Sequence, residues 1–204
     1  MGKRQKQQEE KRARIVKEAI PLFARSGYTQ TTMNEIAKAS GVSFGSVFTY
    51  FGSKSALFEA CVLERLDEWG PLLLEVGGNG GSALRQIEEM IRVHVEWFTR
   101  EQEYLRLIQY VLGQPDRFES LIRHLDEFLV RFQVALRPLI VQGQANGELE
   151  QADADIVALA YISYLNGIRL TIGFPAEEEI WQKFAEQAIW LFRPVRPSGK
   201  AVEQ

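Results

Sequence analysis

A short run of small and hydroxyl-bearing side chains in the N-terminal third of the chain has the chemistry of a surface that contacts a polyanion. Ser46, Thr49 and Tyr50 carry hydroxyls that can reach phosphates or base edges. Gly45 and Ser46 are small, so they allow a partner to approach closely. Lys54 stands at the expected start of the next helix, where its ammonium can join backbone N–H groups in holding a phosphate. This set favours a role in contacting a nucleic-acid backbone and groove.

Two short helices joined by a tight turn would position these side chains. Thr32, followed three residues later by Glu35, is a capping box that starts a helix, and Gly41 supplies the turn. Ser43 is a natural N-cap for a second short helix that runs to about Phe51. This arrangement is a helix-turn-helix, whose second helix enters the major groove of DNA. The structural alternative is an ordinary helical corner, because the same geometry also occurs without DNA.

The net charge of −3 conceals an uneven distribution along the chain. Residues 1–60 carry a net charge of +5, and residues 61–204 carry a net charge of −8. A basic head on an acidic body indicates a polyanionic partner at one end only. A solvated charged tail is the alternative that charge counting leaves open. The basic side chains that could follow a DNA backbone are Lys3, Arg4, Lys6, Lys11, Arg12 and Arg14.

The segment from about residue 10 to residue 60 closely resembles the DNA-binding domain of the TetR (TetR/AcrR) family of transcriptional regulators. The resemblance lies in a first helix with a regular apolar face, in the helix-turn-helix and in the start of the following helix. The matching residues are Ile15, Ala19, Phe23, Gly27, Tyr28, Thr31, Thr32, Ile36, Ala37, Gly41, Val42, Ser43, Gly45, Phe51, Lys54 and Leu57.

The resemblance implies three N-terminal helices for DNA and a divergent helical body for ligand binding and dimerisation. It also implies which residues face DNA. Phe44 stands where the family commonly has a polar or basic residue, and it either contacts a thymine methyl group or simply packs. Phe48 replaces the usual tyrosine, so one phosphate-reaching hydroxyl is missing and the operator sequence does not follow from this helix. The complete DNA-facing set is Thr32, Ser43, Phe44, Gly45, Ser46, Thr49, Tyr50 and Lys54.

Helical periodicity runs through the whole chain, and strand-like alternation is scarce. The predicted fold is all-α: a three-helix helix-turn-helix domain followed by a larger helical ligand-binding and dimerisation domain. Residues 1–54 form the first domain with its basic arm, and residues 55–193 form the second. Residues 194–204 are expected to be a disordered tail. The single cysteine, Cys61, has apolar neighbours and is predicted to be buried.

Two apolar helices over residues 154–172 and 177–192 are the candidate dimer face. Pairs of helices from two subunits would form a four-helix core, and two-fold DNA sites favour a homodimer. The alternative is that both apolar stripes belong to the core of one chain. The candidate dimer residues are Ile156, Leu159, Ala160, Gly167, Ile168, Trp181, Phe184 and Ala188.

Many aromatic side chains in the helices between about residues 84 and 170 are candidates for a ligand chamber, although aromatic stripes at helical spacing usually form core. The ligand would be largely apolar or aromatic, with at most one polar or anionic end. We expect neither a cofactor nor a metal, because no His/Cys/Asp/Glu cluster has metal-ligand spacing. The ligand candidates are His94, Trp97, Phe98, Tyr104, Tyr110, Phe128, Tyr161 and Tyr164.

No nucleophile elbow, phosphate-binding loop or dinucleotide motif is present in the sequence, which argues against an enzyme. No apolar run is long enough to span a membrane and the N-terminus lacks a signal-peptide core, so we expect a cytoplasmic protein. The predicted function is a ligand-responsive repressor that the ligand releases from a palindromic operator. The alternatives are a helical ligand carrier or a protein–protein adaptor without DNA binding. The sequence does not identify the ligand, the operator or the target genes, nor the role of Cys61.

Overall fold

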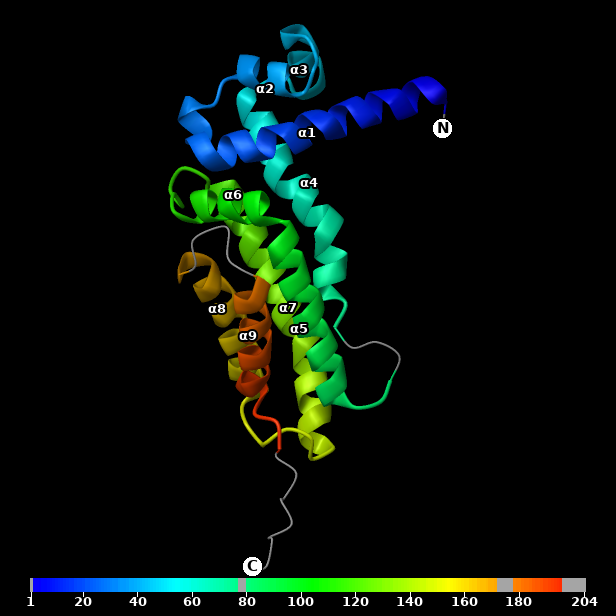
Figure 1. Cartoon of the computed structure of the whole chain (residues 1–204), viewed down its shortest axis with the longest axis vertical. Coiled ribbons are helices and arrows are strands. Elements are labelled where there is room, and N and C mark those ends of the chain that lie inside the picture. Colours follow the sequence, from blue (N-terminus) through cyan, green and yellow to red (C-terminus); the bar gives the residue numbers. More distant parts are fainter. Residues whose placement is uncertain (1, 77–79, 172–177, 196–204) are drawn as a thin grey trace, which may run out of the picture. The chain divides into compact units, whose positions relative to one another are not determined.

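The computed structural model of this chain describes residues 2–76, 80–171 and 178–195. The regular elements in these ranges are helices, and the only strand-like pairing among them is the isolated bridge between Leu149 and Pro194 (Figure 1). The all-α prediction is confirmed. The helices are α1 (Lys3–Gln30), α2 (Met33–Ala39), α3 (Phe44–Phe51), α4 (Lys54–Leu74), α5 (Ala83–Arg100), α6 (Gln102–Leu112), α7 (Glu119–Ala145), α8 (Ala154–Thr171) and α9 (Glu178–Ile189), followed by the 3₁₀ turn η1 (Trp190–Phe192).

The chain divides into two compact units. The first unit comprises Met1–Gly70 and Glu101–Asp126, and the second comprises Pro71–Arg100 and Glu127–Gln204. Helices α4 and α7 therefore each continue from one unit into the other, and α6 belongs to the unit that contains the helix-turn-helix. The predicted boundary after residue 54 separates a DNA-binding part from a ligand-binding part by function, not by compactness, and it stays a prediction. Most of the predicted tail, residues 196–204, lies outside the described residues.

The first unit is built around the apolar face of α1. Ile15, Ala19 and Phe23 recur every four residues on this face and are fully buried, as the sequence pattern predicts. The rings of Phe23 and Phe58 meet edge to face with their centroids 5.0 Å apart, which joins α1 to α4. Cys61 is also buried, as predicted, and burial raises the pKa of its thiol.

The second unit packs α5, α7, α8 and the segment from α9 to η1 around one apolar core (Figure 1). Ile87 of α5, Leu136 of α7 and Ala158 of α8 are fully buried in this core. Glu148 closes one end of the unit, because its carboxylate accepts hydrogen bonds from the Ser82 hydroxyl and from the backbone N–H of Leu84 at the start of α5. The hydrogen bond from Ser82 is the main reason that the pKa of Glu148 falls to about 2.

A histidine lies inside the core of the second unit. His94 Nε2 is 3.1 Å from the backbone oxygen of Leu73, and His94 Nδ1 is 2.9 Å from the hydroxyl oxygen of Tyr161. Because a carbonyl oxygen can only accept, the neutral ring carries its proton on Nε2, and Tyr161 donates to Nδ1. Burial lowers the pKa of His94 to about 4.

This low pKa predicts that acidification destabilises the second unit. Between pH 6.5 and about 4, an unfolded His94 binds a proton that the folded His94 does not, so the free energy of unfolding falls as the pH falls. From pH 7 to pH 5 the expected loss from this group is about 2 kcal/mol. The variant His94→Gln keeps a donor and an acceptor but does not titrate, so it should lose less stability over this range. Urea unfolding of both proteins at the two pH values measures the difference. Equal losses in both would contradict this explanation.

Candidate nucleic-acid interface

Local hydrogen bonds define the start of both helices of the helix-turn-helix. The Thr32 hydroxyl oxygen accepts from the backbone N–H of Glu35 at 3.2 Å, and the Glu35 carboxylate accepts from the backbone N–H of Thr32 at 2.8 Å. The Thr32 hydroxyl also donates to the Glu35 carboxylate at 2.8 Å, and the bond from the Thr32 backbone N–H and this hydroxyl bond lower the pKa of Glu35. Gly41 adopts a φ of 63° in the turn, and the Ser43 hydroxyl oxygen accepts from the backbone N–H of Ser46 at 3.2 Å. The predicted capping box and the predicted N-cap are confirmed.

Helix α3 buries one face and exposes the other. Val47 and Phe51 are one helical turn apart and are buried in the first unit. The opposite face presents Gly45 and Thr49, both exposed, beside two aromatic rings described below. A helix that is anchored on one side and bare on the other is the arrangement required for insertion into a groove.

The hydroxyls of Thr49 and Ser46 in α3, and of the cap residue Ser43, are engaged in local hydrogen bonds. The Thr49 hydroxyl donates to the backbone oxygen of Gly45 at 2.9 Å, and the hydroxyl oxygens of Ser43 and Ser46 are 2.7 Å apart. A hydroxyl has two acceptor lone pairs besides its one donor. Thr49 in this geometry can therefore still accept a hydrogen bond, for example from the exocyclic amine of a base.

Lys54 lies at the first turn of α4, as predicted, and its ammonium contacts the last turn of α1. Its Nζ donates to the backbone oxygen of Thr29 at 3.1 Å and lies 4.7 Å from the centre of the Tyr28 ring. Arg117 contacts the same two residues, with its Cζ 4.9 Å from the Tyr28 ring centre and one N–H donating to the Thr29 hydroxyl. Two N–H groups of the Lys54 ammonium are not used by the Thr29 bond. Phosphate binding by Lys54 stays a prediction.

The corner between α1 and α2 is docked on α6. Gly27 has a φ of 73°, and a Cβ atom at this position would lie 2.9 Å from a carbon of the Tyr110 ring. The backbone N–H of Tyr28 donates to the Tyr110 hydroxyl at 2.9 Å. Only glycine meets both requirements, because it has no Cβ atom: it adopts this left-handed backbone conformation readily, and it leaves room for the Tyr110 ring. Gly27 is among the residues that carry the family resemblance, but the sequence does not show that its partner is Tyr110.

The basic arm is an exposed extension of α1, and no side chain described before Ile15 is buried. Arg12 is the partial exception, because its guanidinium pairs with both carboxylate oxygens of Glu64 and lies 4.8 Å from the centre of the Phe51 ring. The bond to Glu64 raises the pKa of Arg12. Arg12 thus joins α1 to the end of α3 and to α4, a contact that the sequence does not reveal.

The structure divides the ligand candidates between the two units. Tyr104 and Tyr110 lie in the first unit, and the Tyr104 hydroxyl donates to the backbone oxygen of Val62 at 2.9 Å. The other six candidates lie in the second unit. Among these, His94 and Tyr161 hydrogen-bond to each other in the core. The set is therefore divided between the two units, and ligand contact by its members stays a prediction.

Part of the ligand set belongs to a row of aromatic rings in the second unit. The centroids of successive rings are 5.6 to 6.4 Å apart along this row. Trp181 is 3% exposed, and among the described residues its indole N–H has no hydrogen-bond partner. We call these residues the aromatic row: Trp97, Phe98, Trp181, Phe184 and Tyr164.

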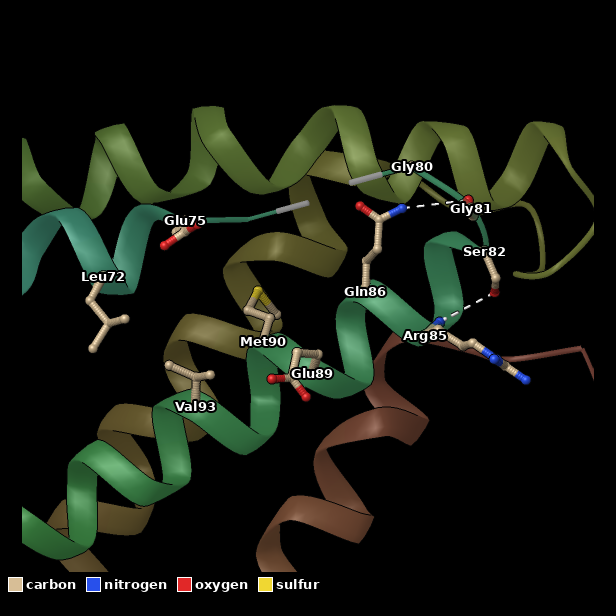
Figure 2. A pocket seen from close by; sticks show the side chains of 10 residues that line it. All are labelled: Leu72, Glu75, Gly80, Gly81, Ser82, Arg85, Gln86, Glu89, Met90 and Val93. Atoms are coloured by element: carbon tan, nitrogen blue, oxygen red, sulfur yellow. Dashed lines mark hydrogen bonds between the residues drawn. The ribbon is translucent and has the colours of Figure 1, made fainter. Parts of the chain in front are cut away.

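A surface groove of 830 Å³ lies on the second unit beside the N-terminal half of α5 (Figure 2). Leu72, Met90 and Val93 give it an apolar side, and charged groups such as Glu75 and Arg85 line the rest. None of the predicted ligand residues lines this groove. A smaller hollow of 340 Å³ lies on the first unit beside Tyr28.

The dimer candidates differ in their exposure. Ile156, Leu159 and Ala160 project from the exposed side of α8, whereas Ile168, Trp181 and Ala188 are buried within their own unit. Gly167 and Phe184 are half-buried.

An exposed apolar stripe on α7 was not predicted. Val130, Val134 and Val141 lie on the side of the helix away from the core, and Val134 is 66% exposed. The spacing of four and seven residues is visible in the sequence, but the stronger stripe that forms the core of the same helix obscures it. Arg137 of α7 pairs with Asp155 of α8, so this stripe lies close to the exposed start of α8.

Comparison with known proteins identifies both parts of the chain. Residues 15–61 match the model described as bacterial regulatory proteins of the tetR family, and residues 80–170 match the tetracyclin repressor-like C-terminal domain. The chain belongs to the TetR family. It is a DNA-binding transcriptional regulator of the helix-turn-helix type, as the resemblance of residues 10–60 predicts.

Individual TetR relatives agree with this assignment. The HTH-type transcriptional regulator AcrR of Shigella flexneri is 32% identical over 120 residues, which span 58% of this chain and 55% of that relative. The fatty acid metabolism regulator protein of Bacillus subtilis is 23% identical over 146 residues, 72% of this chain and 74% of the relative. A crystal structure of a tetR-family regulatory protein from Rhodococcus RHA1 has the same fold, with a TM-score of 0.73 and 23% identity over 91% of this chain and 98% of that one.

Two further properties concern the described residues alone. They include no group of three or more His, Cys, Asp or Glu side chains placed to hold a metal ion. Their helices also lack any segment with the length and apolar character needed to cross a membrane.

Proposed function

We propose that this TetR-family protein is a dimeric repressor that binds a palindromic operator through α3 and releases it when a largely apolar ligand binds to the second unit. One observation carries the proposal: the face of α3 opposite the buried Val47 and Phe51 is bare, within an N-terminal region of net charge +5. Phosphate contacts supply much of the affinity of such a surface, and groove contacts supply its specificity. A cytoplasmic location stays a prediction.

The groove-facing role of α3 is tested at Gly45. A Cβ atom at Gly45 would have no neighbour within 4 Å, so a side chain can be added without disturbing the fold. Gly45→Asp places bulk and negative charge against the DNA, and we expect at least about a tenfold loss of operator affinity. Gly45→Ala is the matched control and should fold as well and bind far better. Fluorescence anisotropy with operator DNA measures both variants, and normal binding by Gly45→Asp would refute the assignment of α3.

The same assay tests the phosphate contact proposed for Lys54. Each lost contact should reduce the slope of log K against log salt by about 0.9. Lys54→Ala should therefore weaken binding to every sequence alike and should flatten the slope. An unchanged slope would remove Lys54 from the interface while leaving α3 in place.

The exposed apolar residues of α8 and α7 support a dimer. Leu159 and Ile156 on α8 and Val134 on α7 expose apolar surface that a second copy would cover. We propose that the exposed members of the predicted dimer set form the centre of the interface and that the α7 stripe extends it. The buried members, such as Trp181, would support these helices from within.

A charge on this face should separate the subunits. We expect Leu159→Asp and Val134→Asp to shift sedimentation from dimer towards monomer and to reduce operator affinity, because a desolvated carboxylate would lie in the interface. Leu112→Asp is the matched control, since Leu112 is similarly exposed at the end of α6 and lies outside the proposed interface. A stable dimer in both test variants, or a monomeric wild-type protein, would contradict the proposed interface.

The aromatic row and the spare indole N–H of Trp181 support a ligand that is apolar with one hydrogen-bond acceptor. A buried donor without a partner costs folding free energy, so an acceptor group of a ligand that hydrogen-bonds to this N–H would recover part of that cost. A relative named as a fatty acid metabolism regulator agrees with an acyl compound as one candidate class. Multi-ring aromatic compounds are the other class that these aromatic rings favour.

Helix α4 is the proposed route from ligand to DNA, because it begins beside the helix-turn-helix and continues into the second unit. Half-sites lie about 34–36 Å apart per helical turn, so a change of a few ångströms in the spacing of two α3 helices would mismatch the grooves. The ligand acts only by binding one spacing more tightly than the other. A tenfold loss of DNA affinity needs about 1.4 kcal/mol of such preference.

Titration of the operator complex with long-chain acyl compounds, multi-ring aromatics and sugars tests the ligand class. We expect release by one of the first two classes, and about tenfold weaker binding of that compound by Trp181→Phe, which keeps a ring but loses the donor. Trp190→Phe, at an exposed tryptophan, is the control. Release by sugars alone would contradict the proposed apolar ligand, and tighter DNA binding with ligand would reverse the proposed direction of the switch.

A further inference from the structure

Two phenylalanine rings dominate the exposed face of α3. Phe44 is 51% exposed and Phe48 is 39% exposed, one helical turn apart. Their ring centroids are 4.9 Å apart with an interplanar angle of 55°, so the two rings form a single apolar surface. Phe44 therefore does not pack into the core, and its ring is available to contact a partner.

The rest of α3 carries few groups that can read bases by hydrogen bonding. Residues 44–51 contain no Arg, Lys, Asn, Gln, Asp or Glu, the residue types that make the usual bidentate or acidic base contacts. The Thr49 hydroxyl donates within its own helix. Base recognition by α3 must therefore rely on a few hydroxyls and on the two rings.

The major groove offers an aromatic ring one apolar feature of its own, the C5-methyl group of thymine. The N-terminal residues of a recognition helix are those that reach base edges, and Phe44 is the first residue of α3. The separation of the two rings, 4.9 Å, lies between one and two base-pair steps of about 3.4 Å. The pair is thus sized to contact methyl groups on neighbouring base pairs.

We propose that Phe44 and Phe48 determine operator specificity by contacting thymine methyl groups in each half-site. This inference rests on the proposed function, since it requires α3 to enter the major groove. It resolves the two roles left open for Phe44 in favour of methyl contact. It also gives Phe48, where the family usually has tyrosine, a role in reading bases instead of holding a phosphate.

Replacing single thymines by deoxyuridine tests the proposal, because deoxyuridine pairs identically but lacks the methyl group. On an operator recovered by selection from genomic fragments, at least one thymine per half-site should weaken wild-type binding by about fourfold when replaced, the effect expected from burying one methyl-sized group. Phe44→Ala or Phe48→Ala should bind the thymine and deoxyuridine forms of that position equally. Phe48→Tyr keeps the ring and should keep the deoxyuridine effect.

Controls separate this proposal from its alternatives. Leu112→Ala removes an exposed apolar side chain elsewhere in the first unit and should leave the deoxyuridine effect intact. Both phenylalanines are substantially exposed, so their alanine variants should melt close to wild type, which makes loss of recognition distinguishable from unfolding.

The outcomes that overturn the proposal are distinct. Tight operator binding without any deoxyuridine effect, or an equal effect in the alanine variants, refutes thymine recognition and leaves the repressor function standing. A change in sedimentation of the alanine variants without a change in sequence preference would assign the rings to self-association instead. Failure of the wild-type protein to select any DNA would refute the proposed function and the thymine contact together.

Discussion

An eight-residue helix has too few internal hydrogen bonds to persist in water, so α3 exists only because the rest of the first unit holds it. Two buried side chains, Val47 and Phe51, attach it to this unit. The cap at Ser43 fixes where the helix begins, and the Arg12 guanidinium packs against Phe51 near its end. With one face fully committed to this anchoring, the opposite face is free to carry whatever side chains a groove requires.

The same constraint explains why the first unit extends beyond the helix-turn-helix. The corner that leads from α1 into α2 is held by Tyr110 of α6, through the bond to the Tyr28 N–H and the close approach to Gly27. Lys54 and Arg117 lie on the Tyr28 ring and contact Thr29. The helix-turn-helix and α6 therefore belong to one compact unit.

Features fixed by neighbouring residues could be predicted from the sequence. The Thr32–Glu35 capping box, the Ser43 cap and the buried face of α1 depend on spacings of three or four residues, and the structure has all of them. Contacts between distant residues could not be predicted, because spacing carries no information about them. His94 and Tyr161 are 67 residues apart, and Arg12 and Glu64 are 52 apart. Periodicity also predicts apolar helices in the body but does not show which face is exposed, so it does not distinguish the buried Trp181 from the exposed Leu159 and does not reveal the exposed Val134.

Selection of bound fragments from the source genome by the full-length protein, followed by sequencing, tests the central claim most directly. A dimer that places its two α3 helices in successive major grooves should enrich DNA fragments that contain two inverted half-sites. Their centres should lie about 10–10.5 base pairs apart, or a multiple of that distance. Recovery of such two-fold symmetric sites is the predicted result. Recovery of no sequence above background, or of single half-sites bound as tightly as paired ones, would contradict the account.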